Sequence, residues 1–240
     1  MRSSGRTAGQ GLRTPRVAAV AGIVSALLLA AAIVLVRLAV PEHPQDAAEW
    51  FADTSQRGSL TTALALVPFA GVFFLWFMGC FRDYVGAAED RFFATLFLGS
   101  GLLFVAMLFA LAATAGSLLA VTGFATHSPG QGRDELWQYG RHFVLTLLSG
   151  YFTRMAAVFV LSTTTIGHRL GVFPRWLAWL GYLVALVLLL SVSSAGHLEL
   201  VFPVWMLAVS GHILVSALRT RVSRSAGPAG SAPPRSHRGG

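Results

Sequence analysis

The chain has 240 residues, of which 55% are hydrophobic and only 12% are charged. A soluble domain carries about twice that charged fraction, so the composition excludes an ordinary water-soluble globule and indicates that lipid is the solvent. The net charge of +8 does not indicate a nucleic-acid partner, because the arginines lie beside apolar runs rather than on one soluble face.

Apolar runs long enough to form membrane helices recur along the chain. A bilayer core requires about 20 apolar residues per helix, and lipid offers no partner to an unpaired backbone N–H or C=O. The runs are 17–36, 60–81, 92–121, 143–166, 176–194 and 198–218. They predict an all-α fold, a polytopic membrane protein with six transmembrane helices in one domain over residues 17–218.

The segments on either side of this domain differ in composition. Residues 219–240 contain Arg, Ser, Pro and Gly with few apolar side chains, and residues 1–16 are similar, so both tails are predicted to be disordered and basic. The first apolar run is too long for a signal peptide and lacks a small-residue cleavage site before Pro41, so we expect it to be retained. The arginines that follow the last run either anchor the topology or contact anionic lipid headgroups.

Arginine placement predicts the orientation of the helices. With the N-terminus inside, most arginines fall in cytoplasmic segments, whereas the outer loops hold Arg57, Arg133 and Arg141, with Arg37 at an outer helix end. Basic residues are retained on the cytoplasmic side of bacterial membranes. We therefore expect an inner-membrane protein with both termini in the cytoplasm.

Arg154 is the candidate for function, because it interrupts the fourth apolar run. It lies eleven residues after Phe143, which places it about 16 Å along the helix from that end. A charge at that depth costs roughly 2.5–3.5 kcal/mol, so it is expected to face the helix bundle and to have a partner.

Glu199 is the expected partner, because the other acidic residues lie in loops and only this one begins an apolar run. The short link at 195–197 predicts that the last two helices are antiparallel neighbours, and Pro203 is expected to free the carbonyl of Glu199, four residues back. The outer half of the bundle is thus predicted to contain a polar site. Its candidate residues are Arg154, Glu199, His197, Tyr151, Thr153, Ser191 and Ser194.

Two functions are compatible with this site. An Arg154–Glu199 pair that holds two helices together indicates a non-enzymatic accessory or structural membrane protein, which works in the bilayer and with an unidentified membrane protein partner. A hydrated Arg154 indicates instead a transporter or a binding component for a small polar or anionic solute. The sequence carries no recognisable catalytic, metal-binding or cofactor-binding motif, so we expect neither enzyme activity nor a cofactor.

Three parts of the chain stand out together: Arg82-Asp83, the stretch 89–103 and the Pro-Arg-Trp-Leu-Ala stretch at 174–178. With these stretches the chain resembles a family of uncharacterised multi-pass inner-membrane proteins that is frequent in actinobacteria. The similarity extends over roughly residues 17–218. The absence of Lys and Asn agrees with the coding bias of such GC-rich genomes. The resemblance implies an inner-membrane location and assigns no activity.

Overall fold

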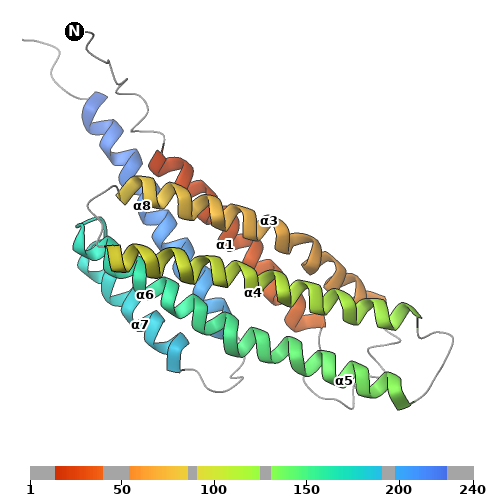
Figure 1. Cartoon of the computed structure of the whole chain (residues 1–240). Helices are drawn as coiled ribbons and strands as arrows, with labels where there is room; N and C mark the ends of the chain where they lie inside the picture. The colour runs from red at the N-terminus through yellow and green to blue at the C-terminus, as the bar shows by residue number, and fades with distance from the viewer. Residues whose placement is uncertain (1–13, 40–53, 86–90, 125–130, 191–197, 226–240) are drawn as a thin grey trace, which may run out of the picture.

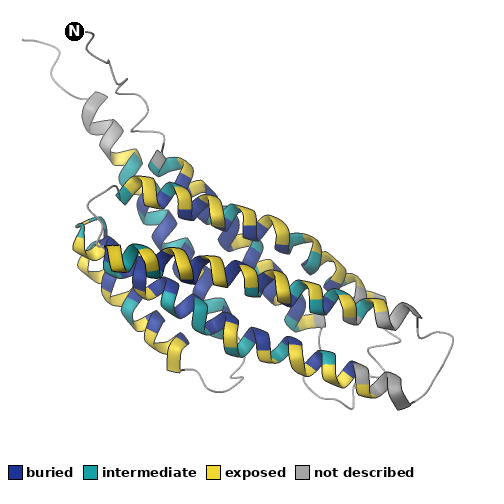
Figure 2. Cartoon of the chain, viewed as in Figure 1, coloured by how far each residue is buried: buried dark blue, intermediate teal, exposed yellow. Residues whose placement is uncertain are grey.

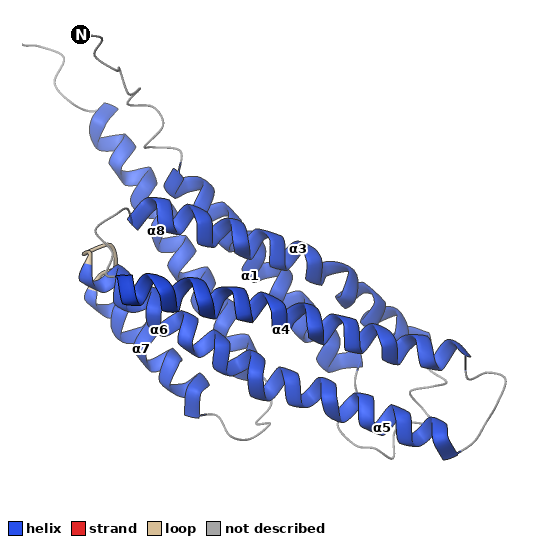
Figure 3. Ribbon diagram, viewed as in Figure 1, coloured by secondary structure: helices blue, strands red, loops and turns tan. Residues whose placement is uncertain are grey.

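The computed structural model describes residues 14–39, 54–85, 91–124, 131–190 and 198–225, and all their regular elements are helical (Figure 3). Along the chain these are α1 (Thr14–Ala39), α3 (Thr54–Val85), α4 (Arg91–Phe124), α5 (Gln131–Thr146), the π-helical segment η4 (Leu147–Phe152), α6 (Thr153–Arg169), α7 (Arg175–Leu190), the 3₁₀ turn η5 (Leu198–Leu200) and α8 (Val201–Ser225). The prediction of an all-α fold is therefore confirmed for the part of the chain that is described.

Within the described ranges, five helical segments are long and apolar enough to cross a membrane. They are Pro15–Leu38, Gly58–Val85, Arg91–Ser117, Trp137–Arg169 and Leu198–Arg219. The remaining predicted span, 176–194, corresponds to α7, which has 16 residues, and residues 191–194 lie outside the described ranges. The helices have the length and composition that an integral membrane protein requires, and the six-span count stays a prediction.

The helices pack side by side in one elongated bundle (Figure 1). α1 contacts α3 and α8, α3 contacts α4, α4 contacts α5 and α6, and α6 contacts α7. α8 also contacts α7 and α6, which joins the two edges of the bundle. We call the end at which α1 begins and α8 finishes the basal end, and the end that holds Arg37 and Glu199 the apical end. The expected contact between α7 and α8 is present, but α8 packs mainly on α1.

Aromatic side chains fill the centre of the bundle. Phe159 is fully buried on α6, with ring centroids 4.9 Å from Phe74 on α3 and 5.1 Å from Phe97 on α4. Phe104 lies 4.8 Å from Phe202 on α8, so four helices meet through these rings. Such ring pairs add about 0.5–1.5 kcal/mol beyond the burial of their area. The exposed residues lie on the outward faces of the helices (Figure 2), and the buried ones face the interior of the bundle.

A tight turn links α6 to α7 at the basal end. Gly171 has a φ of 69°, and the N–H of Phe173 donates to the carbonyl of Gly167 at 3.0 Å. A glycine in this left-handed conformation is the usual end of an α-helix. The two helices then run close together, because Gly181 on α7 faces Thr164 on α6 without a side chain between them.

Several helix bounds differ from those expected. α5 begins at Gln131, so Arg133 and Arg141 lie in a helix rather than in an outer loop. α5, η4 and α6 follow one another without a break from residue 131 to 169, and α4 and α5 reach further at the apical end than α1 and α7 (Figure 1). α1 and α8 extend a few residues into the predicted tails, whose other residues lie outside the described ranges.

Candidate polar site

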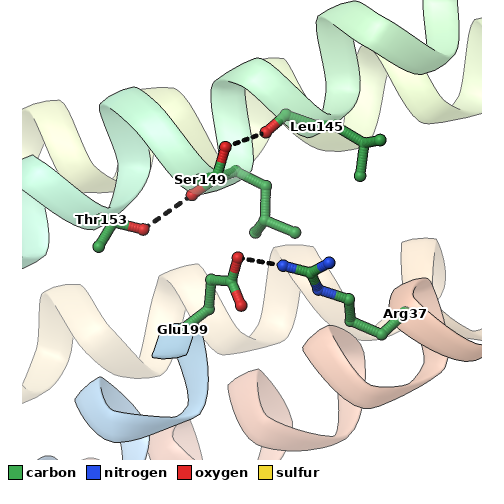
Figure 4. A network of polar contacts seen from close by, with 6 residues as sticks. Arg37, Leu145, Ser149, Thr153 and Glu199 are labelled. Atoms are coloured by element: carbon green, nitrogen blue, oxygen red, sulfur yellow. Dashed lines mark hydrogen bonds and ion pairs between the residues drawn. The ribbon is translucent and has the colours of Figure 1, made fainter. Parts of the chain in front are cut away.

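An ion pair between Arg37 and Glu199 lies at the apical end of the bundle (Figure 4). Arg37 is in the last turn of α1, and Glu199 is in the 3₁₀ turn η5 that leads into α8. The guanidinium Nη2 donates to the carboxylate Oε1, and the side chains are 14% and 4% exposed. The pair therefore joins the first and last helices across 162 residues of sequence.

The position of Glu199 follows from where α8 begins. Its carboxylate precedes the first turn of the helix, where the unpaired backbone N–H groups create a partial positive charge that favours an anion. Pro203 lies in the first turn of α8, which begins at Val201. A proline there lacks the N–H that would bond to the carbonyl four residues back, so the start of α8 agrees with the expectation that Pro203 frees the carbonyl of Glu199, which stays a prediction.

The predicted ion pair between Arg154 and Glu199 is also wrong. The structure pairs Glu199 with Arg37, and the guanidinium of Arg154 instead donates to the carbonyl of Gly150, one turn earlier in its own helix, at 3.0 Å. Helical side chains lean toward the N-terminus of their helix, so this contact directs the charge toward the apical end. Arg154 lies fifteen residues before Arg169, or about 22 Å from the basal end of α6, so it can reach outward instead of crossing to α8.

The helical segment beside Arg154 is wound as a π-helix. η4 covers Leu147–Phe152, and the buried hydroxyl of Thr153 donates to the carbonyl of Leu148, five residues back, at 2.9 Å. Ser149 donates to the carbonyl of Leu145, four residues back, at 2.7 Å. Figure 4 shows these two side chains on the helix opposite Glu199 and Arg37. Local π-turns are rare and frequently occur at functional positions of helices.

The other predicted site residues have different positions. Tyr151 is 58% exposed and lies on the outer face of the bundle, so it is not part of this interior cluster. Thr153 is buried beside it on the inward face. Ser191, Ser194 and His197 lie outside the described residues. Of the predicted set, the structure therefore brings Glu199 and Thr153 to the same part of the bundle, and keeps Arg154 on its own helix.

Arg37 is the residue of this polar cluster that sequence reasoning does not identify. Its position at an outer helix end indicates by itself only a charge that sets the topology. One signal was available: with the N-terminus inside, the end of the first span and the start of the last span lie at the same membrane surface. Arg37 and Glu199 lie at similar depths in the membrane and can form an ion pair directly. Arg154 lies more than two helical turns deeper than Glu199, so it is the less suitable partner.

The chemistry of the cluster is that of a buried carboxylate held by one guanidinium. Oε2 of Glu199 is buried and has no hydrogen-bond partner within the described part of the chain. A pocket of ≈ 50 Å³ lies against Arg37, lined by Ile33, Val34, Leu38 and Leu200. That volume accommodates a water molecule, which needs at least ~10–15 Å³, but is small for an organic solute. Among the described residues, no group of three or more His, Cys, Asp and Glu side chains is placed to hold a metal ion.

Comparison with known proteins adds no relative to this description. No family model, curated protein or solved structure matches the chain. The fold therefore defines the class by itself: the described part of the chain is a helical bundle in which five helices are long and apolar enough to cross a membrane.

Proposed function

We propose that this chain is an integral protein of a bacterial cell membrane with a structural or accessory role and no catalytic activity. The observation that carries the proposal is the pairing of charges within the chain. Glu199 is held by Arg37, and Arg154 is held by a carbonyl of its own helix. Charges that are satisfied internally stabilise a helix bundle, whereas a solute site leaves a charge available for the solute.

The proposed topology has six spans, with α7 as the fifth and both termini in the cytoplasm. In that arrangement the basal end faces the cytoplasm and the apical ion pair lies near the outer surface. The arginines of the described basal end support it, since Arg16, Arg82, Arg169 and Arg175 all lie there. The partners in this proposal are the lipid bilayer and another membrane protein that contacts the exposed helix faces.

A second function is favoured by a specific observation. The π-helical segment η4 lies opposite a carboxylate oxygen that has no described partner, as Figure 4 shows for Ser149, Thr153 and Glu199. These groups form the core of a site for a small polar solute if the helices part slightly. In this alternative the chain is a transporter or binding component, and Arg154 supplies the positive charge for an anionic solute.

Thermal unfolding of the purified chain with a panel of small solutes separates the two proposals. The panel contains inorganic phosphate, sulfate, small carboxylates and amino acids, and compares the wild-type chain with Arg154→Gln. The structural proposal predicts that no solute raises the unfolding temperature in a way that depends on Arg154. A solute that stabilises the wild type and loses this effect in Arg154→Gln would overturn it in favour of the solute-binding function.

Arg175→Gln is the matched control for this experiment. It removes one exposed arginine from the start of α7, at the opposite end of the bundle from the polar site. A solute effect that both variants lose reflects the total charge of the protein. An effect that only Arg154→Gln loses locates the solute beside η4.

A further inference from the structure

A groove opens between α1 and α3 in the basal half of the bundle. It has a volume of ≈ 240 Å³. Its lining consists of Arg16, Val17, Val20, Ala21, Phe73 and Trp76. The floor is the small, buried Ala21, whereas Val20 and Trp76 form walls that are 52% and 53% exposed on the outward face. A closed cavity of about 150 Å³ holds a benzene molecule, so this groove has room for several methylene groups of a chain.

One end of the groove carries a positive charge. Arg16 lies one helical turn before Val20, and residues four apart share a helix face, so its side chain stands at the basal mouth of the groove. Among the described residues, its guanidinium donates to the carbonyl of Ala217 on α8, at the long distance of 3.5 Å. A guanidinium has five N–H donors in a planar fork, which suits a phosphate group.

The surroundings strengthen this charge. α1 begins at Thr14, so the partial positive charge of its N-terminus lies within a turn of Arg16. The exposed Arg219 follows Ala217 on α8, and the exposed Arg82 is in the last turn of α3. The described acid at this end is Asp83, which is exposed and adjacent to Arg82. The mouth of the groove is therefore complementary to an anion.

We propose that this groove binds one anionic phospholipid, with an acyl chain between α1 and α3 and the phosphate headgroup on Arg16. The indole of Trp76 lies along the chain near the interface, the level at which Trp is enriched in membrane proteins. In lipid the acyl chain gains no hydrophobic free energy by entering the groove, because its surroundings are already apolar. Selectivity therefore comes from the headgroup charge, and the groove fixes where the lipid sits.

A second groove provides a matched control within the same molecule. It lies between α6 and α7, has a volume of ≈ 310 Å³, and is lined by Ala157, Val158, Leu161, Tyr182, Ala185, Leu186 and Leu189. It is similarly apolar but has no charged residue in its lining. An acyl chain that enters this groove meets no headgroup partner, so its binding does not depend on headgroup charge.

The experiment measures thermal stabilisation of the purified full chain in detergent by phosphatidylglycerol, and by phosphatidylcholine with the same acyl chains. We expect phosphatidylglycerol to stabilise at lower concentration. Arg16→Gln should weaken this response about fivefold, which corresponds to the ~1 kcal/mol that one arginine contributes near an anionic surface. Val20→Trp should abolish it by filling the groove from an exposed position, whereas Leu186→Trp should leave it unchanged. Arg82→Gln, at a position outside the lining, should weaken it by less than Arg16→Gln does.

Each other outcome contradicts a part of the proposal. Equal stabilisation by phosphatidylcholine, or the same stabilisation by inorganic phosphate, would show that no anionic lipid is selected. If Arg16→Gln leaves the response unchanged, the phosphate headgroup does not bind Arg16. If Val20→Trp leaves it unchanged, the acyl chain does not lie in the groove. Loss of the response in Arg82→Gln to the same extent would show a diffuse attraction of the basal end instead of a site.

Discussion

Arg37 and Glu199 connect the last turn of α1 to the start of α8 through a largely buried ion pair. α1 and α8 pack along each other, and the pair lies at the apical end of that contact. Removing one partner of a buried pair leaves an uncompensated charge, at a cost of about 3–5 kcal/mol. The pair thus fixes the register of the first and last helices at the apical end, while at the basal end Arg16 on α1 donates to the carbonyl of Ala217 on α8.

Close packing of α6 on α7 depends on Gly181. A Cβ atom at this position would lie 2.2 Å from Oγ1 and 2.8 Å from Cγ2 of Thr164. Rotation of the branched Thr164 side chain exchanges one clash for the other, so the helices must separate. We expect Gly181→Ala to lower the free energy of unfolding by about 1–3 kcal/mol, measured by denaturation in detergent.

Gly99→Ala is the control for this prediction. Gly99 is an exposed helical glycine with no atom within 4 Å of a Cβ built on it. Alanine should fit there and stabilise the helix by up to about 1 kcal/mol. Equal losses in the two variants would contradict the close contact between α6 and α7.

The aromatic centre of the bundle predicts a large effect for Phe159→Ala. Phe159 is fully buried and its ring contacts Phe74, Phe97 and Phe202. Its truncation should cost about 3–5 kcal/mol of unfolding free energy, because the surrounding rings cannot close the cavity. Phe69→Ala removes a ring that is 61% exposed on α3 and should change stability by much less. Similar losses in both variants would show that Phe159 does not occupy the core.

Much of the helical fold could be predicted from the sequence, because a bilayer restricts the backbone to a few solutions. Runs of apolar residues locate α1, α3, α4, α6, α7 and α8, and their positions need no tertiary information. The helix ends are less predictable. α5 begins at Gln131 in polar sequence, and its buried Trp137 and Arg141 reflect packing on α4 that composition does not reveal.

The candidate site could be predicted only in part. The sequence indicates Glu199, because a carboxylate that begins an apolar run must find a partner. The choice of partner for Glu199 depends on which helices are neighbours in space. The short link before α8 predicts a contact with α7, whereas α8 packs mainly on α1. The π-turn of η4, which changes the direction of side chains after Leu147, has no clear sequence signal. The packing of α8 on α1 and the π-turn of η4 therefore explain why Arg154 does not pair with Glu199.

Reporter fusions test the proposed orientation. Fusions after Ser55 and Gln131 should report an extracytoplasmic location, and fusions after Ala87 and at the C-terminus should report the cytoplasm, since arginines are retained on that side. Activity of an alkaline phosphatase reporter and fluorescence of a GFP reporter give opposite signals at each position. A cytoplasmic signal after Gln131 would remove the six-span topology, because α4 could not then cross the membrane outward.

The central claim is that Glu199 is paired with Arg37 inside the chain and not with Arg154. Two double-mutant cycles measured by unfolding in detergent test it, one with Arg37→Ala and Glu199→Ala, the other with Arg154→Ala and Glu199→Ala. Residues in contact deviate from additivity by about 0.5–3 kcal/mol, and independent residues add within about 0.5 kcal/mol. If a single variant does not fold, recovery of folded protein in the double variant is itself evidence of coupling.

We predict coupling above about 1 kcal/mol in the Arg37–Glu199 cycle and additivity in the Arg154–Glu199 cycle. In the first cycle the double variant should be little less stable than either single variant, because it leaves no unpaired charge. Additivity of Arg37 and Glu199, together with coupling of Arg154 and Glu199, would contradict the internal pair and the structural role that depends on it.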